Sequence, residues 1–154
     1  YTSSEDNSIL QAELARESIE NLGLKYVEVT VSNSNEVQQA TQSIVNQCDA
    51  IYIPTDNIFA SAMPIVHGVV LESKTPVICG EAGMVNSGGL ATLGINYYDL
   101  GYQTGLMAVK IFEGAEISSM PIESASGFDF AINGTVAREI GLEIPADLQQ
   151  YIIE

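Results

Sequence analysis

Short apolar segments alternate with helix-like stretches along almost the whole chain, and this alternation constrains the fold more than any other feature. The segments 50–53, 77–79 and 90–95 are almost wholly apolar, as is typical of strands that helices cover on both faces. Between them, residues 57–73 and 98–113 carry apolar side chains at helical spacing. Such alternation forms right-handed βαβ units. We therefore predict the α/β class, a doubly wound parallel sheet flanked by helices.

Further elements are expected before and after this central part. The sequence predicts helices at 8–21, 34–46, 133–140 and 146–153, and strands at 24–31, near Ile122 and at 128–132. In the first helix, Leu10, Leu14, Ile19 and Leu22 stand at core spacing. That helix has no strand before it, although residues 1–4 resemble the loop that leaves a strand. We therefore expect the chain to be a piece whose preceding strand lies upstream of Tyr1.

The charge balance restricts the possible partners. The 154 residues include 5 Lys and Arg but 20 Asp and Glu, which gives a formal net charge of −15. A surface that follows phosphates needs clustered basic residues, so we expect neither nucleic acid nor an anionic membrane as a partner. Hydrophobic residues make up 46% of the chain, enough to build a core. The longest apolar run, Ile58–Leu71, is too short to cross a membrane.

Residues that carry chemistry are scarce. His67 lies in the middle of a predicted helix between valines, where we expect it to pack rather than to catalyse. Cys48 and Cys79 begin one predicted strand and end the next, so we expect free, buried thiols and no disulfide. The phosphate-binding glycine patterns of nucleotide sites are absent from the sequence. We therefore expect no enzyme activity, no metal and no cofactor.

Polar side chains follow each predicted strand at its carboxyl end. In a parallel sheet these ends share one edge, where ligands bind. The candidate ligand-binding residues, in chain order, are Ser4, Glu5, Asn7, Thr55, Asp56, Asn57, Glu81, Asn96 and Tyr97. Helix N-termini near Ser8 and Asn57 favour a carboxylate, while Asp56 and Glu81 suit an ammonium group. A tyrosine adds a stacking face, so the set suits a small zwitterion or polar solute.

Each candidate also has a purely structural explanation. Ser4, Asp6 or Ser8 would cap the first helix, and Asp56 or Asn57 would cap the helix predicted at 57–73. Glu81 would be a solvated loop charge, and Tyr97 would be half-buried in packing. The shared edge adds only modest weight to the ligand hypothesis, because loops between strands and helices always share that edge.

Four segments together resemble a known family. They are Tyr1–Ser8, Ile53–Asn57, Gly94–Gly101 and the tail from Phe128 through Pro145. In order and spacing they are similar to the second half of substrate-binding proteins of ABC transporters, in the group linked to tryptophan and related aromatic amino acids. The resemblance covers essentially all 154 residues.

The resemblance implies a type I periplasmic-binding fold, in which two lobes close on a ligand. Residues 1–89 and 121–154 would then belong to the second lobe, and 90–120 would be a strand–helix unit of the first lobe. The hinges would lie near Gly89–Leu90 and near Pro121. The N-terminal lobe is absent from the sequence, so the helix of the 90–114 unit would need exchange between chains, or an altered packing, to become buried.

The resemblance favours a transport receptor that passes an amino-acid-like ligand to an ABC permease. Such a protein works outside the cytoplasm, in the periplasm or as a lipoprotein at the cell surface. Two alternatives share this class of fold. One is the effector-binding domain of a transcription regulator, which would require a DNA-binding module upstream. The other is an enzyme on a flavodoxin-like sheet. The identity of the ligand stays open at this point.

Overall fold

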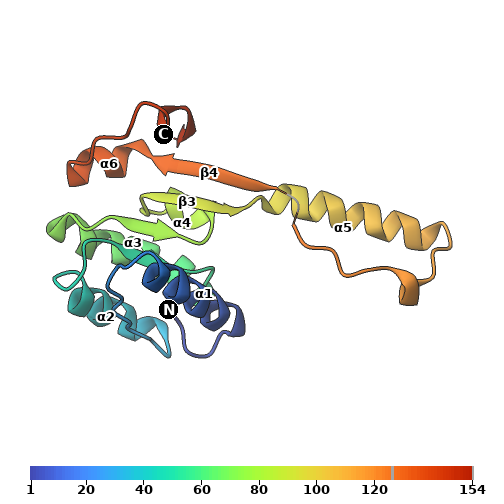
Figure 1. Cartoon of the computed structure of the whole chain (residues 1–154), viewed down its shortest axis with the longest axis horizontal. Coiled ribbons are helices and arrows are strands. Elements are labelled where there is room, and N and C mark those ends of the chain that lie inside the picture. The colour runs from blue at the N-terminus through green and yellow to red at the C-terminus, as the bar shows by residue number, and fades with distance from the viewer. Residues whose placement is uncertain (126, 154) are drawn as a thin grey trace.

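The computed structural model describes residues 1–125 and 127–153, which form a five-stranded sheet with helices around it (Figure 1). The strands lie in chain order across the sheet: β1 (Ile51–Ile53), β2 (Val77–Cys79), β3 (Ala91–Ile95), β4 (Phe128–Asn133) and β5 (Ile152–Ile153). Neighbouring strands are parallel except for β3 and β4, which are antiparallel. The α/β class is confirmed, but the expectation of a wholly parallel sheet is wrong at this pair. The chain leaves β3 and re-enters β4 at the same end of the sheet, which forces opposite directions.

Within the described residues, six α-helices accompany the sheet. They are α1 (Asp6–Asn21), α2 (Val37–Ile44), α3 (Asn57–Ser73), α4 (Ala82–Asn86), α5 (Tyr97–Phe112) and α6 (Gly134–Ile140). The short helix α4 lies between β2 and β3, where the sequence pattern predicts no helix. Two expected elements do not form: Ile122 lies in no strand and is fully exposed, and residues 146–153 form only a 3₁₀ turn that leads into β5. None of the helices in the described part of the chain combines the length and the apolar character needed to cross a membrane.

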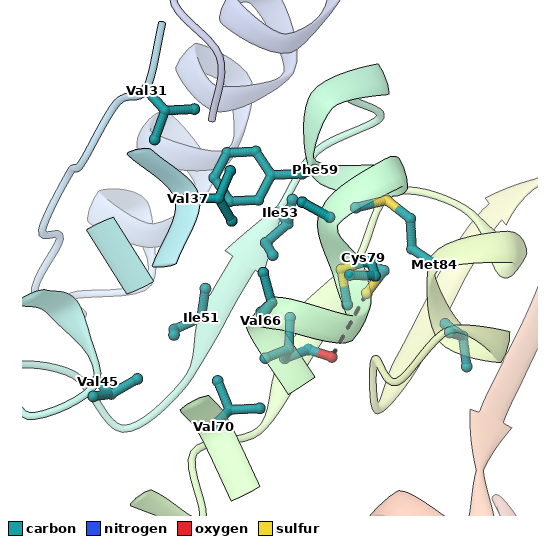
Figure 2. Packing of buried hydrophobic residues seen from close by; sticks show 14 residues of the cluster. Val31, Val37, Val45, Ile51, Ile53, Phe59, Val66, Val70, Cys79 and Met84 are labelled. Atoms are coloured by element: carbon teal, nitrogen blue, oxygen red, sulfur yellow. Dashed lines mark hydrogen bonds between the residues drawn. The ribbon is translucent and has the colours of Figure 1, made fainter. Parts of the chain in front are cut away.

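The main core lies between α2, α3, α4 and the strands β1 and β2. Figure 2 shows side chains from these elements meeting in one cluster, with Phe59 and Met84 among the largest. Met63, at the centre of α3, has no exposed surface. A second, smaller cluster lies around Leu90 and α6. Close packing of this kind makes the body of the molecule the rigid support for the loops at its edge.

The first helix presents a different face to the core from the one we expected. Leu10 and Leu14 are 57% and 55% exposed, whereas Ala12 is buried. The inner face of α1 instead carries smaller side chains, from Ser8 through Ala12. The prediction that these leucines lie in the core is therefore wrong. The hydrogen bonds of Ser8 to Thr55 and Asp56 hold the Ser8 face of α1 against the rest of the molecule, and the leucines lie outside that face.

The segment 24–31 is extended but forms almost no ladder. Its one bridge joins Val31 to Thr2 in parallel fashion. Residues 24–30 are assigned to no strand, so the strand expected there is confirmed only at its last residue.

Helix α5 projects away from the rest of the molecule, as Figure 1 shows at the right. None of its residues is buried. The chain returns from its far end through residues 113–125. Gln103 of α5 donates to the Glu123 carboxylate at 2.8 Å and to the Ser124 carbonyl at 3.2 Å, and Lys110 approaches Glu123 at 3.9 Å. We call the described residues of 96–127 the arm, and the rest of the described chain the body.

Candidate ligand-binding site

The loops that carry the predicted site residues are neighbours along one edge of the sheet. Ser8 donates to the carbonyl of Thr55 at 3.2 Å, and Thr55 donates to the carbonyl of Gly80 at 3.5 Å. A Cβ built on Gly94 would lie 2.8 Å from that same Gly80 oxygen, so the start of the arm lies next to the loop of Glu81. We call the loops 1–8, 54–57, 80–81 and 94–97 the carboxyl edge. Glycine is required at position 94, because any larger residue would collide with the neighbouring loop.

Asp56 is the structural centre of this edge. Its carboxylate is 2% exposed and accepts four hydrogen bonds: from the Thr2 backbone at 2.7 Å, the Thr2 hydroxyl at 2.8 Å, the Ser8 hydroxyl at 2.6 Å and the Phe59 backbone at 2.9 Å. Burial acts to raise the pKa of this carboxyl, but the hydrogen bonds from Ser8, Phe59 and Thr2 outweigh it and lower the pKa. The Asp56 side chain thus caps α3 and holds the N-terminal loop against it. Because each carboxylate oxygen accepts two hydrogen bonds from the protein, none of its lone pairs faces outward.

Glu5 lies against the N-terminus of α3. Its carboxylate accepts from the Asn57 backbone at 3.1 Å, the Asn57 side chain at 2.8 Å and the Ile58 backbone at 3.3 Å. A carboxylate suits this position because the first N–H groups of a helix carry partial positive charge. Two predicted ligand residues, Glu5 and Asn57, therefore bind each other, and the start of α3 is occupied by side chains of the protein itself.

Glu81 and Asn96 cap the helices that follow them. The Glu81 carboxylate accepts from Gly83 at 2.7 Å and from Met84 at 2.8 Å. Asn96 accepts from Asp99 at 2.9 Å and donates to Asp129 at 2.8 Å, which joins the start of the arm to strand β4 of the body. The capping explanation thus accounts for several of the predicted site residues.

Other side chains at the carboxyl edge are exposed or make a single bond within the protein. Ser4 is exposed, and the Tyr97 side chain is 53% exposed. Helix α1 has no side-chain cap at its N-terminus, since Ser8 turns inward and neither Ser4 nor Asp6 caps it. Asn7 donates to the carbonyl of Thr55 at 2.7 Å.

Thr2 and Ser8 are buried partners of Asp56 that the sequence alone did not single out for this role. The signal available was weak, because short polar residues are common in any loop before a helix.

Chemistry beyond binding finds no support in the described residues. No cluster of three or more His, Cys, Asp and Glu suited to a metal occurs within 1–125 and 127–153. His67 lies away from the carboxyl edge, with one ring nitrogen 3.1 Å from the Gly88 carbonyl and the other 3.8 Å from Glu139. Cys48 and Cys79 are free thiols; Cys79 is buried as expected, whereas Cys48 is only partly buried. Burial raises the pKa of Cys79 to about 12.

The sequence model of one family, the ABC transporter substrate binding proteins, matches residues 1–154. This chain therefore belongs to the family of ABC transporter substrate-binding proteins. A protein from Clostridioides difficile named tyrosine-binding protein is 37% identical over 153 residues, which are 99% of this chain and 44% of the relative.

Solved structures match the whole chain. A Streptococcus pneumonia ABC domain in complex with L-Trp is 35% identical with a TM-score of 0.90, and the match covers 99% of this chain and 53% of that one. A ligand-free, open structure of a Clostridium difficile substrate-binding protein with adhesive properties is 42% identical with a TM-score of 0.78, covering 100% and 52%. The chain thus spans about half the length of the relatives that it matches. These matches support the predicted fold family and do not favour a transcription regulator.

Proposed function

We propose that this chain is the second lobe of a transport receptor that captures an aromatic amino acid between two lobes for an ABC importer. The match of the substrate-binding family over residues 1–154 is the observation that carries the proposal. The names of the tyrosine-binding relative and of the L-Trp complex support an aromatic ligand. Proteins of this family deliver solute and do not transform it, so we propose no catalytic residue and no cofactor. The partners are the ligand and an ABC permease, and the place of action is extracytoplasmic, with tethering as a lipoprotein or residence in the periplasm.

The arm supports the two-lobe arrangement. The resemblance assigns residues 1–89 and 121–154 to this lobe and 90–120 to the other; we propose that the body, β3 included, forms this lobe and that the arm packs on the other lobe. Strand β3 pairs with β2 inside the body, so the crossing itself begins at Asn96. The superposition on the ligand-free, open structure is poorer than on the L-Trp complex, although its sequence identity is higher. A different angle between body and arm in the open structure would lower its TM-score in this way.

Without the other lobe, a second copy of this chain exchanging the 90–114 unit would be the alternative cover for α5. The exposed apolar residues of the arm include Leu106, Val109 and Phe112. Sedimentation of the isolated chain distinguishes the two arrangements, because exchange between copies gives a dimer whereas docking on another lobe leaves this chain monomeric.

The nine candidates at the carboxyl edge fall into two proposed groups. We propose that Asp56, Glu5, Asn57 and Asn96 hold the loops in place through their bonds within the protein. We propose that the ligand contacts come from Ser4, Asn7, Thr55, Glu81 and Tyr97, with the uncapped N-terminus of α1 facing the ligand carboxylate. Asn7, Thr55 and Glu81 also bond within the protein, so they would serve both the loops and the ligand. The outer face of Glu81 would attract the ligand ammonium, and Tyr97 would stack on the aromatic ring.

Isothermal titration tests this proposal in a polypeptide that contains both lobes. We expect L-tyrosine or L-tryptophan to bind, and adenine and glucose to give no heat. Replacement of Tyr97 by alanine should weaken binding by roughly 1 kcal/mol, the usual contribution of an aromatic pair. Tyr98→Ala is the matched control, since Tyr98 is 80% exposed and, as the next residue of the helix, leaves it in a different direction from Tyr97. Equal affinities for the two variants would remove Tyr97 from the site, and no binding of either amino acid would contradict the function.

A further inference from the structure

Thr92, in strand β3, carries a buried hydroxyl group that has no hydrogen-bond partner among the residues that the structure describes. The side chain is 1% exposed, and its hydroxyl oxygen is shielded from solvent. Such a group costs free energy, because it gives up hydrogen bonds to water and gains none in return. A valine would fill nearly the same space without that cost. Unpartnered buried hydroxyls are rare in native proteins, so the hydroxyl of Thr92 calls for a functional explanation.

This hydroxyl lies directly below the carboxyl edge. A Cβ built on Gly94 would be 2.8 Å from the Thr92 hydroxyl oxygen and also 2.8 Å from the Gly80 carbonyl oxygen. The two oxygens therefore flank one point, and no side chain separates them because residue 94 is glycine. Gly80 begins the loop that follows β2, and Gly94 leads into the arm. A strong acceptor at the ligand site thus lies close to a hydroxyl that lacks an acceptor.

A second threonine already reaches the Gly80 carbonyl, but weakly. The Thr55 hydroxyl donates to it at 3.5 Å, whereas hydrogen bonds between a hydroxyl and an oxygen usually measure about 2.7–2.8 Å. The backbone of Thr55 is held more firmly: its N–H donates to Gln11 at 2.8 Å, and its carbonyl accepts from Asn7 at 2.7 Å. The Thr55 hydroxyl can therefore change partners by side-chain rotation, while its loop stays in place.

We propose that Thr92 is a positioning residue for the ligand site, and that ligand binding exchanges the donor to the Gly80 carbonyl. In this structure Thr55 donates to that carbonyl. When the ligand enters, the loop of Gly80 shifts toward Thr92, whose hydroxyl becomes the new donor. The Thr55 hydroxyl then turns to a polar group of the ligand. This inference rests on the proposed function, in which Thr55 is one of the ligand contacts.

The exchange gives the buried hydroxyl a role in affinity. Thr92 has no partner before the exchange and gains one through it, so the bound arrangement is favoured over the free one. The Gly80 carbonyl keeps a donor throughout, and the ligand gains the Thr55 hydroxyl. A group that acts in this way strengthens binding without stabilising the ligand-free fold. That combination separates it from an ordinary buried side chain.

The experiment uses a polypeptide that contains both lobes, with isothermal titration of L-tyrosine and L-tryptophan and thermal unfolding without ligand. Thr92→Val removes the hydroxyl and nearly preserves the shape of the side chain. We expect it to weaken binding about fivefold, the contribution of one hydrogen bond, and to leave the unfolding midpoint unchanged or raised. Thr92→Ser keeps the hydroxyl and should bind within about twofold of the natural chain.

Thr75→Val is the matched control. Thr75 is also buried, but it precedes β2, at the opposite end of the strand from the carboxyl edge, and its hydroxyl lies 2.8 Å from the Ser73 hydroxyl. We expect Thr75→Val to lower the unfolding midpoint by about 2 °C and to leave the affinity unchanged, because a bond within the fold is lost. The two valine variants should therefore show opposite profiles of affinity and stability.

A double-mutant cycle tests the link between the two threonines of the exchange. Thr55→Val removes the hydroxyl that turns to the ligand. If Thr92 acts through that hydroxyl, Thr92→Val should weaken binding by less than about twofold once residue 55 is valine. Independent effects would instead multiply.

Three results overturn the inference. Thr92→Val binds as tightly as the natural chain, or Thr92→Val loses as much stability as Thr75→Val, which would show a hydroxyl already bonded in the free protein, or the effects of Thr55→Val and Thr92→Val multiply. Each of these, with normal binding by the natural chain, rejects the exchange alone. If the natural chain binds neither L-tyrosine nor L-tryptophan, the proposed function fails and the exchange fails with it.

Discussion

The body and the arm of this molecule differ in whether their apolar side chains are buried. In the body, Val37, Met63 and Met84 have no exposed surface and belong to one continuous cluster (Figure 2). In the arm, no residue of α5 is buried, and even its large side chains are exposed: Tyr102 is 64% and Phe112 is 89% exposed. Isolated helices gain little stability from their own backbone, so a helix rich in exposed apolar residues indicates a surface that another part of the protein covers.

This contrast supports the proposal that the chain carries one lobe and also a piece of another. The arm is held to the body by the continuity of β3 and β4 and by the bond between Asn96 and Asp129. Glu123 ties the return segment to α5 through Gln103 and Lys110. These contacts fix local geometry at the base and along the helix, but they bury little apolar surface. Substitutions in the two regions should therefore differ sharply in effect.

The largest contrast is expected between two methionines. Met63→Ala should lower the free energy of unfolding of the body by about 3 kcal/mol, because it leaves a cavity at the centre of the main core. Met107→Ala in α5 is the matched control, and it should change that free energy by less than about 0.5 kcal/mol. Chemical denaturation measures both. Equal losses would show that the arm is packed as tightly as the body.

A second contrast compares two aspartates that precede or open a helix. Asp56→Ala should destabilise the body by about 2 kcal/mol, since Thr2, Ser8 and the start of α3 lose their common acceptor. Asp99→Ala, in the exposed first turn of α5, should have an effect of about 0.5 kcal/mol or less. Thermal unfolding of both variants is the measurement, and a larger loss for Asp99→Ala would contradict the structural role of Asp56.

The lowered pKa of Asp56 predicts a dependence on pH. Because its pKa in the folded protein lies below the usual value of 3.8, the ionised carboxylate stabilises the fold at and above that pH. This contribution is lost as the pH falls through the lowered value. The gap in unfolding free energy between the natural chain and Asp56→Asn should therefore be constant near pH 7 and shrink below about pH 4. A gap that widens on acidification would reverse the assigned sign.

The smallest effect is expected within the arm. Lys110 and Glu123 approach to 3.9 Å, and the lysine side chain is 57% exposed. Exposed ion pairs of this kind contribute little, so Lys110→Ala should change the stability of the chain by less than about 0.5 kcal/mol. Hydrogen exchange of residues 113–125 gives a more sensitive reading. Strong local loss of protection would show that this pair, rather than chain continuity, fixes the return segment.

Apolar pattern predicted the elements whose periodicity is unambiguous. The bounds of β2, α3 and α5 agree with the sequence prediction to within one residue, and the helix cap at Asp56 was one of the stated alternatives. Strand direction was not foreseeable, because β4 has the same composition whether it runs parallel or antiparallel to β3. The face of α1 was mispredicted because leucines outrank alanines in any core estimate, yet Ala12 is the buried one.

The candidate site shows where sequence reasoning ends. A carboxylate or amide before a helix looks the same whether it caps that helix or binds a ligand. The structure separates these roles at Asp56 and Glu5, whose oxygens bond to the protein itself. Ser4 and Tyr97 cap no helix and are exposed, and their assignment as ligand contacts stays a prediction.

Amide hydrogen exchange in a two-lobed polypeptide containing this chain, with and without saturating L-tyrosine, tests the central claim most directly. The account predicts slower exchange in the carboxyl edge, at residues 1–8, 54–57, 80–81 and 94–97, together with a protected α5 in both states because the facing lobe covers it. Unchanged exchange at all four loops, or an α5 that exchanges as freely as an isolated helix, would contradict the account.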